Sequence, residues 1–120
     1  MQTHTVSQNQ WKTIFDSLSR VYDGSRATME VLDAELGAQH EVDDQPFRGI
    51  SYDPAGIELH FMMGNGRHVT HRIPRPKEVR IEEADNGLVV GLAIESDNDP
   101  QVVLQLHAPV PSHLLTRGEG

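Results

Sequence analysis

The amino-acid sequence predicts an α+β protein in which one N-terminal amphipathic helix packs on a twisted antiparallel β-meander of about seven strands. The helix is predicted because apolar residues recur with a helical period only near the N-terminus. The strands are predicted because the rest of the chain alternates between apolar and polar residues, with short turns between the segments. No second helix is available for crossovers between parallel strands, so antiparallel pairing is expected. A closed small barrel is left open as an alternative to an open sheet.

Length and composition indicate one soluble domain. A chain of 120 residues is expected to form a single domain, here residues 7–110, with flexible termini at 1–6 and 112–120. The net charge of −8 argues against nucleic acid and anionic membrane surfaces as partners. The absence of cysteine excludes disulfides and thiolate chemistry. Because the sequence has neither a signal-peptide pattern nor an apolar run of about 20 residues, the expected location is the cytoplasm.

The helix is predicted to begin at Ser7 and to end before Gly24. Ser7 and Gln10 have the spacing of a capping box, and glycine is the usual residue just after a helix. The apolar residues of this segment fall on a single stripe: Trp11, Ile14, Phe15, Leu18 and Val21. A stripe of this composition is expected to be buried against a sheet.

Short segments with a period of two follow the helix. The expected strands comprise residues 26–33, 38–42, 47–53, both arms of a hairpin at 57–73, and residues 77–84, 88–95 and 101–107. Residues 43–46 (DDQP) are expected to form a loop between two of these strands. A two-residue turn at Asn86-Gly87 is expected after 77–84, because it places apolar residues opposite one another, Ile81 with Leu92 and Val79 with Ile94.

The hairpin at 57–73 allows its register to be tested against its own side chains. A two-residue loop at Asn65-Gly66 would set Phe61 against Thr70, an apolar residue against a polar one. A three-residue loop at 64–66 instead makes one face nearly all apolar, with the pairs Phe61–Val69, Leu59–His71 and Ile57–Ile73. On the other face this loop pairs Glu58 with Arg72, His60 with Thr70 and Met62 with His68. Because cross-strand pairs select the register, the three-residue loop is predicted.

Several short motifs resemble those of one protein family. They are W-K-T-I-F-D-S-L-S-R at 11–20, T-M-E-V-L at 28–32, L-G-A-Q at 36–39, P-F-R-G-I at 46–50, T-H-R-I at 70–73 and A-I-E-S at 93–96. The family consists of small bacterial proteins catalogued only as a domain of unknown function, and the resemblance covers roughly residues 10–108. It implies an α+β protein, and it implies no activity, cofactor or catalytic residue. One departure is Ser25 after Gly24, where the family tends to have an aromatic residue.

Two histidines of the hairpin are candidate metal ligands. The predicted register puts His60 and His68 on one polar face as diagonal neighbours, near enough for two imidazoles to reach one ion. Met62 lies opposite His68 and offers a soft ligand, so Zn²⁺ or copper is the metal to expect. Two histidines alone are an incomplete site, and a third ligand would have to come from another strand, for example His40 or His107. The alternative interpretation is that both are exposed sheet residues.

His71 is predicted on the opposite, apolar face of the hairpin. One interpretation is a structural histidine whose ring nitrogens are satisfied by the backbone or by a helix side chain. The other is a pocket between helix and sheet, with Asp16 or Ser17 as the partner of the imidazole. A cavity beneath His71 distinguishes the two interpretations.

The sequence contains no constellation that fits an enzyme. No serine sits in a nucleophile elbow, and the acidic residues mostly fall at solvent-facing strand positions. The predicted function is therefore a non-enzymatic protein-interaction module. Its contact surface for a protein partner or for self-association is the hairpin tip, Met62, Met63, Asn65, Arg67 and His68, because exposed methionines adapt to irregular partners. The alternative is a protein that binds a small ligand or a transition metal through His60, His68 and His71.

Overall fold

The structure, a computed structural model, describes residues 2–97 and 99–116. These residues form an α+β fold, as predicted, with eight strands rather than about seven. The elements in chain order are β1 (Gln2–Val6), η1 (Gln8–Gln10), α1 (Trp11–Tyr22), β2 (Arg26–Asp33), β3 (Gly37–Asp53), β4 (Gly56–Met62), β5 (His68–Ile73), β6 (Pro76–Glu83), β7 (Leu88–Ser96), β8 (Asp99–Pro111) and α2 (His113–Thr116).

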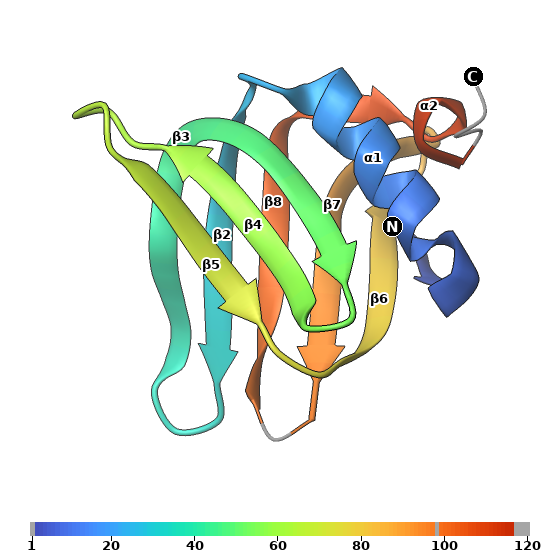
Figure 1. Cartoon of the computed structure of the whole chain (residues 1–120). Coiled ribbons are helices and arrows are strands. Elements are labelled where there is room, and N and C mark those ends of the chain that lie inside the picture. Colours follow the sequence, from blue (N-terminus) through green and yellow to red (C-terminus); the bar gives the residue numbers. More distant parts are fainter. Residues whose placement is uncertain (1, 98, 117–120) are drawn as a thin grey trace.

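All eight strands belong to one antiparallel sheet. Their order is β1-β6-β7-β8-β2-β3-β4-β5, which leaves β1 and β5 at the two edges. Strand β3 arches over the top of the molecule and carries β4 and β5 in front of β2 and β8 (Figure 1). The strands described in 2–97 and 99–116 show no pairing between β5 and β1. The sheet is therefore strongly curled but open, and the small-barrel alternative was wrong.

The long strand β3 replaces two predicted strands and the loop between them. Residues 43–46 do not interrupt it, although its pairing with β2 is irregular there, between the partners of Ala27 and Glu30. Asp44 adopts a left-handed backbone with φ of 53°. Aspartate tolerates this conformation better than most residues, so the strand bends here instead of ending. Because of the bend, the first part of β3 pairs with β2 in a back layer that also contains β8. The second part pairs with β4 in a front layer that also contains β5.

The start of the helix differs from the predicted capping box. The Ser7 side chain makes no capping hydrogen bond, and the Gln10 N–H donates to the Ser7 carbonyl in a 3₁₀ turn, at 2.9 Å. The α-helix begins at Trp11, whose indole Nε1–H donates to the Val6 carbonyl at 3.0 Å. This hydrogen bond of the indole ring, and not a Ser7 cap, ties the segment before the helix to its first turn.

At the end of α1, Tyr22 is buried in place of Val21. Val21 is 37% exposed and Tyr22 is 2% exposed. Eleven residues make about three helical turns, so Tyr22 lies almost at the angle of Trp11, whereas Val21 lies beside the stripe. The Tyr22 ring packs on Phe47 of β3, with ring centroids 6.0 Å apart.

The chain termini are more ordered than expected. Residues 1–6 were expected to be flexible, but Gln2–Val6 form β1, which pairs with β6 from Gln2↔Glu83 to Val6↔Val79. The sequence QTHTV has no apolar alternation, so side-chain patterning carried no signal for this strand. At the other end α2 buries Leu115. Residues 117–120 of the predicted tail lie outside the described residues.

The hairpin of β4 and β5 has the predicted register. Ile57↔Ile73, Leu59↔His71 and Phe61↔Val69 are paired, as are Glu58↔Arg72, His60↔Thr70 and Met62↔His68. The loop spans three residues, because the Met63 N–H donates to the Arg67 carbonyl at 2.7 Å. Gly66 has the left-handed φ of 84° that this loop requires.

The turn between β6 and β7 was predicted one residue too short. The Ala84 N–H donates to the Leu88 carbonyl at 2.8 Å, so the loop has three residues and ends on a left-handed Gly87. In the pairing of β6 with β7, Glu83 lies opposite Val89 and Glu82 lies opposite Gly91, so an irregularity at residue 90 absorbs the extra residue. The predicted apolar pairs Ile81↔Leu92 and Val79↔Ile94 are nevertheless present.

One core fills the space between the two layers and α1. Phe47 and Phe61 of the front layer are both fully buried, with their rings 5.8 Å apart. The helix contributes Trp11, Phe15 and Leu18 to the same core. Among the described helices, none is long and apolar enough to cross a membrane.

Candidate functional site

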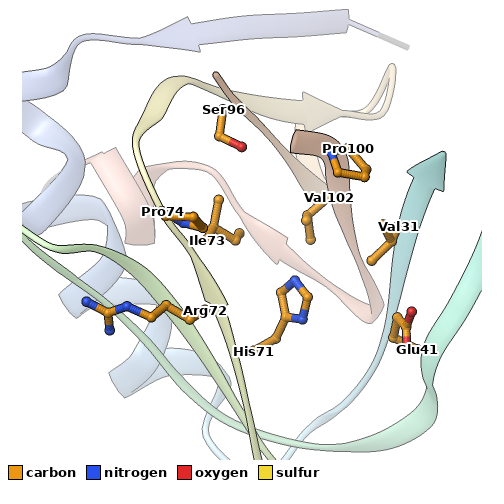
Figure 2. Close-up of a pocket in the computed structure, with 9 residues that line it drawn as sticks. All are labelled: Val31, Glu41, His71, Arg72, Ile73, Pro74, Ser96, Pro100 and Val102. Atoms are coloured by element: carbon orange, nitrogen blue, oxygen red, sulfur yellow. The ribbon is translucent and has the colours of Figure 1, made fainter. Parts of the chain in front are cut away.

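A pocket of about 260 Å³ lies where the free edge of β5 passes in front of β2 and β8 (Figure 2). Five strands and the segment after β5 contribute to its wall, and α1 contributes nothing. The lining residues are Val31, Glu41, His71, Arg72, Ile73, Pro74, Ser96, Pro100 and Val102. The pocket exists because the curl brings β5 over the other layer without pairing to it.

Local pairing explains the apolar part of the wall. Val31 of β2 pairs with Val102 of β8, so both side chains point to the same face of the back layer. Ile73 and His71 lie two residues apart on β5 and therefore share one face of the front layer. The back layer supplies a floor of valines, and the front layer supplies the imidazole.

The His71 imidazole is a half-buried titratable group in the pocket wall. Burial lowers the pKa of His71 from its ordinary value of 6.5, and the nearby Glu41 carboxylate partly opposes this effect. The ring is therefore neutral at pH 7, with one nitrogen as donor and the other as acceptor. Within residues 2–97 and 99–116, neither nitrogen has a side-chain hydrogen-bond partner.

Ser96 adds a buried hydroxyl to the same wall. Ser96 is only 6% exposed, and its Oγ has no hydrogen-bond partner among the described residues. Among the described residues, the other buried side-chain atoms without a hydrogen-bond partner are Ser17 Oγ and Gln45 Oε1, and neither residue lines the pocket. The pocket thus contains a polar atom whose hydrogen-bonding capacity is unused.

A strained segment closes one side of the pocket. Arg75, between Pro74 and Pro76, has a left-handed φ of 48°, which is unfavourable for a long side chain. Its carbonyl accepts the N–H of Asp97 at 3.2 Å, next to Ser96. Pro74 and Ser96 are therefore held by a backbone contact between the segment after β5 and the end of β7.

The charge of Arg72 does not reach the pocket interior. Its Nη1 forms an ion pair with the Glu58 carboxylate across the outer face of the hairpin. Figure 2 shows the guanidinium extending away from the His71 ring. The polar groups left in the pocket are the Glu41 carboxylate, the His71 imidazole and the Ser96 hydroxyl.

The pocket of His71 lies elsewhere than the sequence indicated. It was predicted between helix and sheet, with Asp16 or Ser17 as partner, but no helix residue lines it. Asp16 is exposed and paired with Lys12, at 3.1 Å. The pairing of Leu59 with His71 correctly predicted the inward face, yet the sequence held no signal that Glu41 would lie near the ring.

The predicted metal ligands His60 and His68 are not joined by a third ligand. His60 Nδ1 lies 3.1 Å from Thr70 Oγ1, and its Nε2 lies 3.5 Å from Glu58 Oε1. His68 is exposed at the end of β5. Among the described residues, no group of three or more histidines and acids is placed to hold a metal ion. Binding of zinc or copper here stays a prediction.

The predicted contact surface at the hairpin tip lacks exposed methionines. Met62 and Met63 are both half-buried, and Met63 packs against the core. Asn65 is exposed, and its Oδ1 accepts the Arg67 N–H at 3.0 Å, which stabilises the loop itself. Arg67 and His68 remain as exposed charged or titratable groups. The premise of the tip prediction was wrong, and the partner contact itself is untested.

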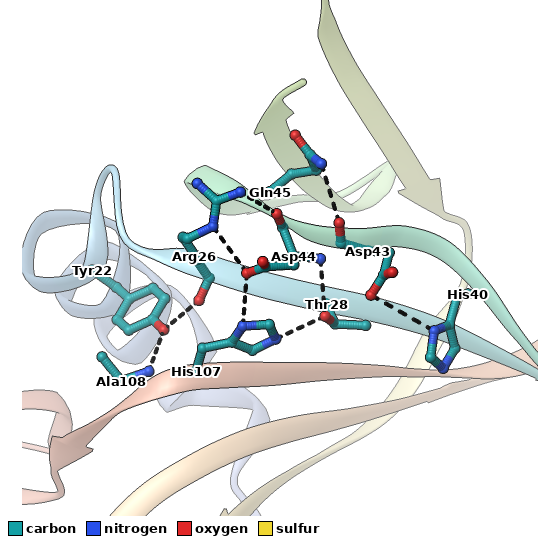
Figure 3. Close-up of polar contacts among 9 residues, drawn as sticks. All are labelled: Tyr22, Arg26, Thr28, His40, Asp43, Asp44, Gln45, His107 and Ala108. Atoms are coloured by element: carbon teal, nitrogen blue, oxygen red, sulfur yellow. Dashed lines mark hydrogen bonds and ion pairs between the residues drawn. The ribbon is translucent and has the colours of Figure 1, made fainter. Parts of the chain in front are cut away.

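A second polar cluster, which the sequence did not predict, lies at the bend of β3 (Figure 3). His107 Nδ1 is 2.9 Å from Asp44 Oδ1, and its Nε2 is 2.8 Å from Thr28 Oγ1. An acid, an imidazole and a hydroxyl in this order can activate a nucleophile. Here the Thr28 hydroxyl already accepts the Asp44 N–H at 3.1 Å, and the residue is 3% exposed. The cluster therefore holds the bend, and it offers no accessible nucleophile.

Comparisons with known proteins identify the family of this chain and add no activity. A family model described as "Family of unknown function (DUF5335)" matches residues 2–113. The chain belongs to this family. The resemblance noted from the short motifs is thereby confirmed. A protein of Aquifex aeolicus (strain VF5), described as "Uncharacterized protein", is 31% identical over 113 residues, which cover 92% of this chain and 97% of that protein. No solved structure gives a significant match.

Proposed function

We propose that this DUF5335 protein binds a small organic ligand in the pocket between β5 and the back layer. The observation that carries the proposal is the buried Ser96 hydroxyl without a partner, in the same wall as the desolvated imidazole of His71. An unsatisfied buried polar group costs about 1–3 kcal/mol. A ligand that hydrogen-bonds to Ser96 would remove this cost, so the pocket gains from being filled.

Size and composition of the pocket support binding of a small molecule. A volume of about 260 Å³ lies just below the range of about 300–1,000 Å³ that holds drug-sized ligands. Apolar walls with a few polar groups are typical of sites that fix the orientation of a ligand. The polar groups come from different strands, with no nucleophile hydrogen-bonded to a base, which favours binding over catalysis.

The other predicted functions have less support. The methionines that favoured a protein contact at the hairpin tip are half-buried, and Met63 contributes to the core. For metal binding, His60 is already engaged by Thr70 and Glu58. Neither surface contains a buried group that needs a partner, whereas the pocket does.

Amide chemical-shift mapping with a library of small neutral, anionic and cationic fragments tests the proposal. We expect binding fragments to shift the amides of Val31, His71 and Val102, which surround the pocket. Val31→Trp, which fills the pocket, should abolish these shifts. Val103→Trp is the matched control, because Val103 is on the other face of β8 and is also half-buried. Fragments that bind elsewhere, or equally to both variants, would overturn the proposal.

A further inference from the structure

We propose that the ligand is a small primary amine, bound as its ammonium ion between Glu41 and His71, with an apolar body against the valine floor and a hydroxyl near Ser96. This inference rests on the proposed function, because it names the ligand class of the same pocket. It follows from the hydrogen-bonding capacities of the three polar groups, from the pairing of charges around the pocket, and from their placement.

The polar wall of the pocket is rich in acceptors. An ionised Glu41 carboxylate only accepts hydrogen bonds, and a neutral His71 imidazole offers one acceptor nitrogen. Ser96 offers an oxygen with two lone pairs beside its one donor. An alkylammonium ion carries three donors and no acceptor, so it matches Glu41 and His71. A carboxylate or phosphate would face the Glu41 charge with its own.

Glu41 is the acid in this region that lacks a cation. Its neighbours are paired: Glu30 Oε2 lies 2.8 Å from His40 Nε2, and Asp44 Oδ1 lies 2.9 Å from both Arg26 Nε and His107 Nδ1. No ion pair is found for Glu41 within residues 2–97 and 99–116. The guanidinium of Arg72, the cation of the pocket wall, is held by Glu58 on the outer face. A ligand cation would therefore supply the missing charge.

The protein as a whole also favours a cation over an anion. Its net charge is −8, with 18 acidic residues against 10 basic ones, so the surrounding field attracts positive ligands. Glu41 itself is exposed, and the ion pair is screened by solvent in consequence. We accordingly expect the ion pair to make a modest contribution to the free energy of binding, and the apolar body of the ligand to make a comparable one.

The placement of Ser96 suggests a second polar group on the ligand. In Figure 2 the Ser96 hydroxyl and the Glu41 carboxylate lie on opposite sides of the pocket, with Val102 and Ile73 between them. Val102 of the floor and Ile73 of the opposite wall are 3% and 2% exposed, so they offer a dry apolar surface to a short hydrocarbon chain. A hydroxyl at the end of that chain would use the free hydrogen-bonding capacity of Ser96.

Four probes with the same five-carbon body test the ligand class by calorimetry or NMR titration at pH 7. They are aminopentanol, pentylamine, pentanol and pentanoate. We expect affinity to fall in that order, with pentanoate not binding. Glu41→Gln should weaken pentylamine roughly five-fold, the effect of losing a partly exposed ion pair of about 1 kcal/mol, and should leave pentanol unchanged. Glu35→Gln is the matched control, since it removes the same charge from an exposed site outside the pocket.

The hydroxyl is tested separately from the ammonium group. Ser96→Ala should lower the affinity of aminopentanol to that of pentylamine, while Ser17→Ala, which removes another buried unpartnered hydroxyl, should have no effect. Equal binding of pentanol, pentanoate and pentylamine, or indifference to Glu41→Gln, would overturn the amine inference and leave the ligand pocket intact. If neither these probes nor the fragment library moves the pocket amides, both proposals are wrong.

Discussion

Asp44 Oδ1 lies 2.9 Å from His107 Nδ1, and this contact joins the bend of β3 to β8 (Figure 3). The other side of the imidazole contacts the Thr28 hydroxyl, which accepts the backbone N–H of Asp44. The three residues thus form a closed ring of hydrogen bonds around a left-handed residue. The bend carries β4 and β5 over the back layer, and the pocket lined by His71 lies between these two layers.

Removing the Thr28 hydroxyl should destabilise the bend. Thr28→Val keeps the shape of the side chain but leaves the Asp44 N–H and one His107 nitrogen without their partner, which we expect to lower the free energy of unfolding by about 1–3 kcal/mol. Thr28→Ser retains the hydroxyl and serves as the control. Urea unfolding measures both variants. Equal midpoints for the two would show that the hydroxyl does not hold the bend.

The phenol of Tyr22 should contribute to stability through two backbone contacts. Its hydroxyl donates to the Arg26 carbonyl at 2.6 Å and accepts the Ala108 N–H at 2.9 Å, and burial raises its pKa. Tyr22→Phe leaves both backbone groups without their hydrogen-bond partner. We therefore expect the free energy of unfolding, measured by chemical unfolding, to fall by about 1–2 kcal/mol. Tyr52→Phe is the control. It loses an exposed hydrogen bond from Gln8, and its free energy of unfolding should stay within about 0.5 kcal/mol of the original value. A reversed order would contradict this account.

Two glycines with left-handed backbones should respond very differently to a methyl group. At Gly56, with φ of 144°, an added Cβ would overlap the carbonyl oxygen of Ile73 next to the pocket. We expect Gly56→Ala to cost at least about 3 kcal/mol, because backbone strain and a backbone clash combine. Gly66→Ala has the strain alone, since nothing lies within 4 Å, and should cost about 1–2 kcal/mol. Thermal unfolding compares them, and similar losses would refute the predicted clash.

Stability should depend on pH through His71. Burial lowers its pKa below the ordinary 6.5, so below pH 6.5 the unfolded chain binds a proton that the folded protein does not. The free energy of unfolding should therefore fall as the pH drops below about 6.5, and this contribution should level off below the folded pKa. NMR titration of the imidazole checks the midpoint. His71→Asn, unfolded in urea across the same pH range, should lack this part of the pH dependence; an unchanged profile would exclude His71 as its source.

The local part of the fold was open to prediction from side-chain chemistry. The register of β4 with β5 follows from setting Phe61 against Val69, because directly opposed residues lie close enough to select each other. The same argument paired Ile81 with Leu92, although it missed the extra turn residue that the irregularity after Val89 absorbs. A bulge compensates a turn without changing the pairs, so the pairs alone cannot reveal it.

The site depended on contacts that no local pattern encodes. Glu41 and His71 belong to strands that are not paired, and their proximity follows from how far the sheet curls. His107 and Asp44 meet because β3 bends through residues that resemble a loop. In the helix, the predicted stripe ended at Val21 and left out Tyr22, although the angle of Tyr22 places it on the buried face.

By itself, the sequence determined the α+β class, the order of most elements, the register of the β4–β5 hairpin and the inward face of His71. Each of these follows from periodicity along the chain or from residues on adjacent, hydrogen-bonded strands. The tertiary structure alone decided that β3 is continuous, that the sheet stays open, and that Glu41, His71 and Ser96 line one pocket. The spacing of unpaired strands is set by the accumulated twist of the sheet and by the bend at Asp44, and neither is written in any single segment.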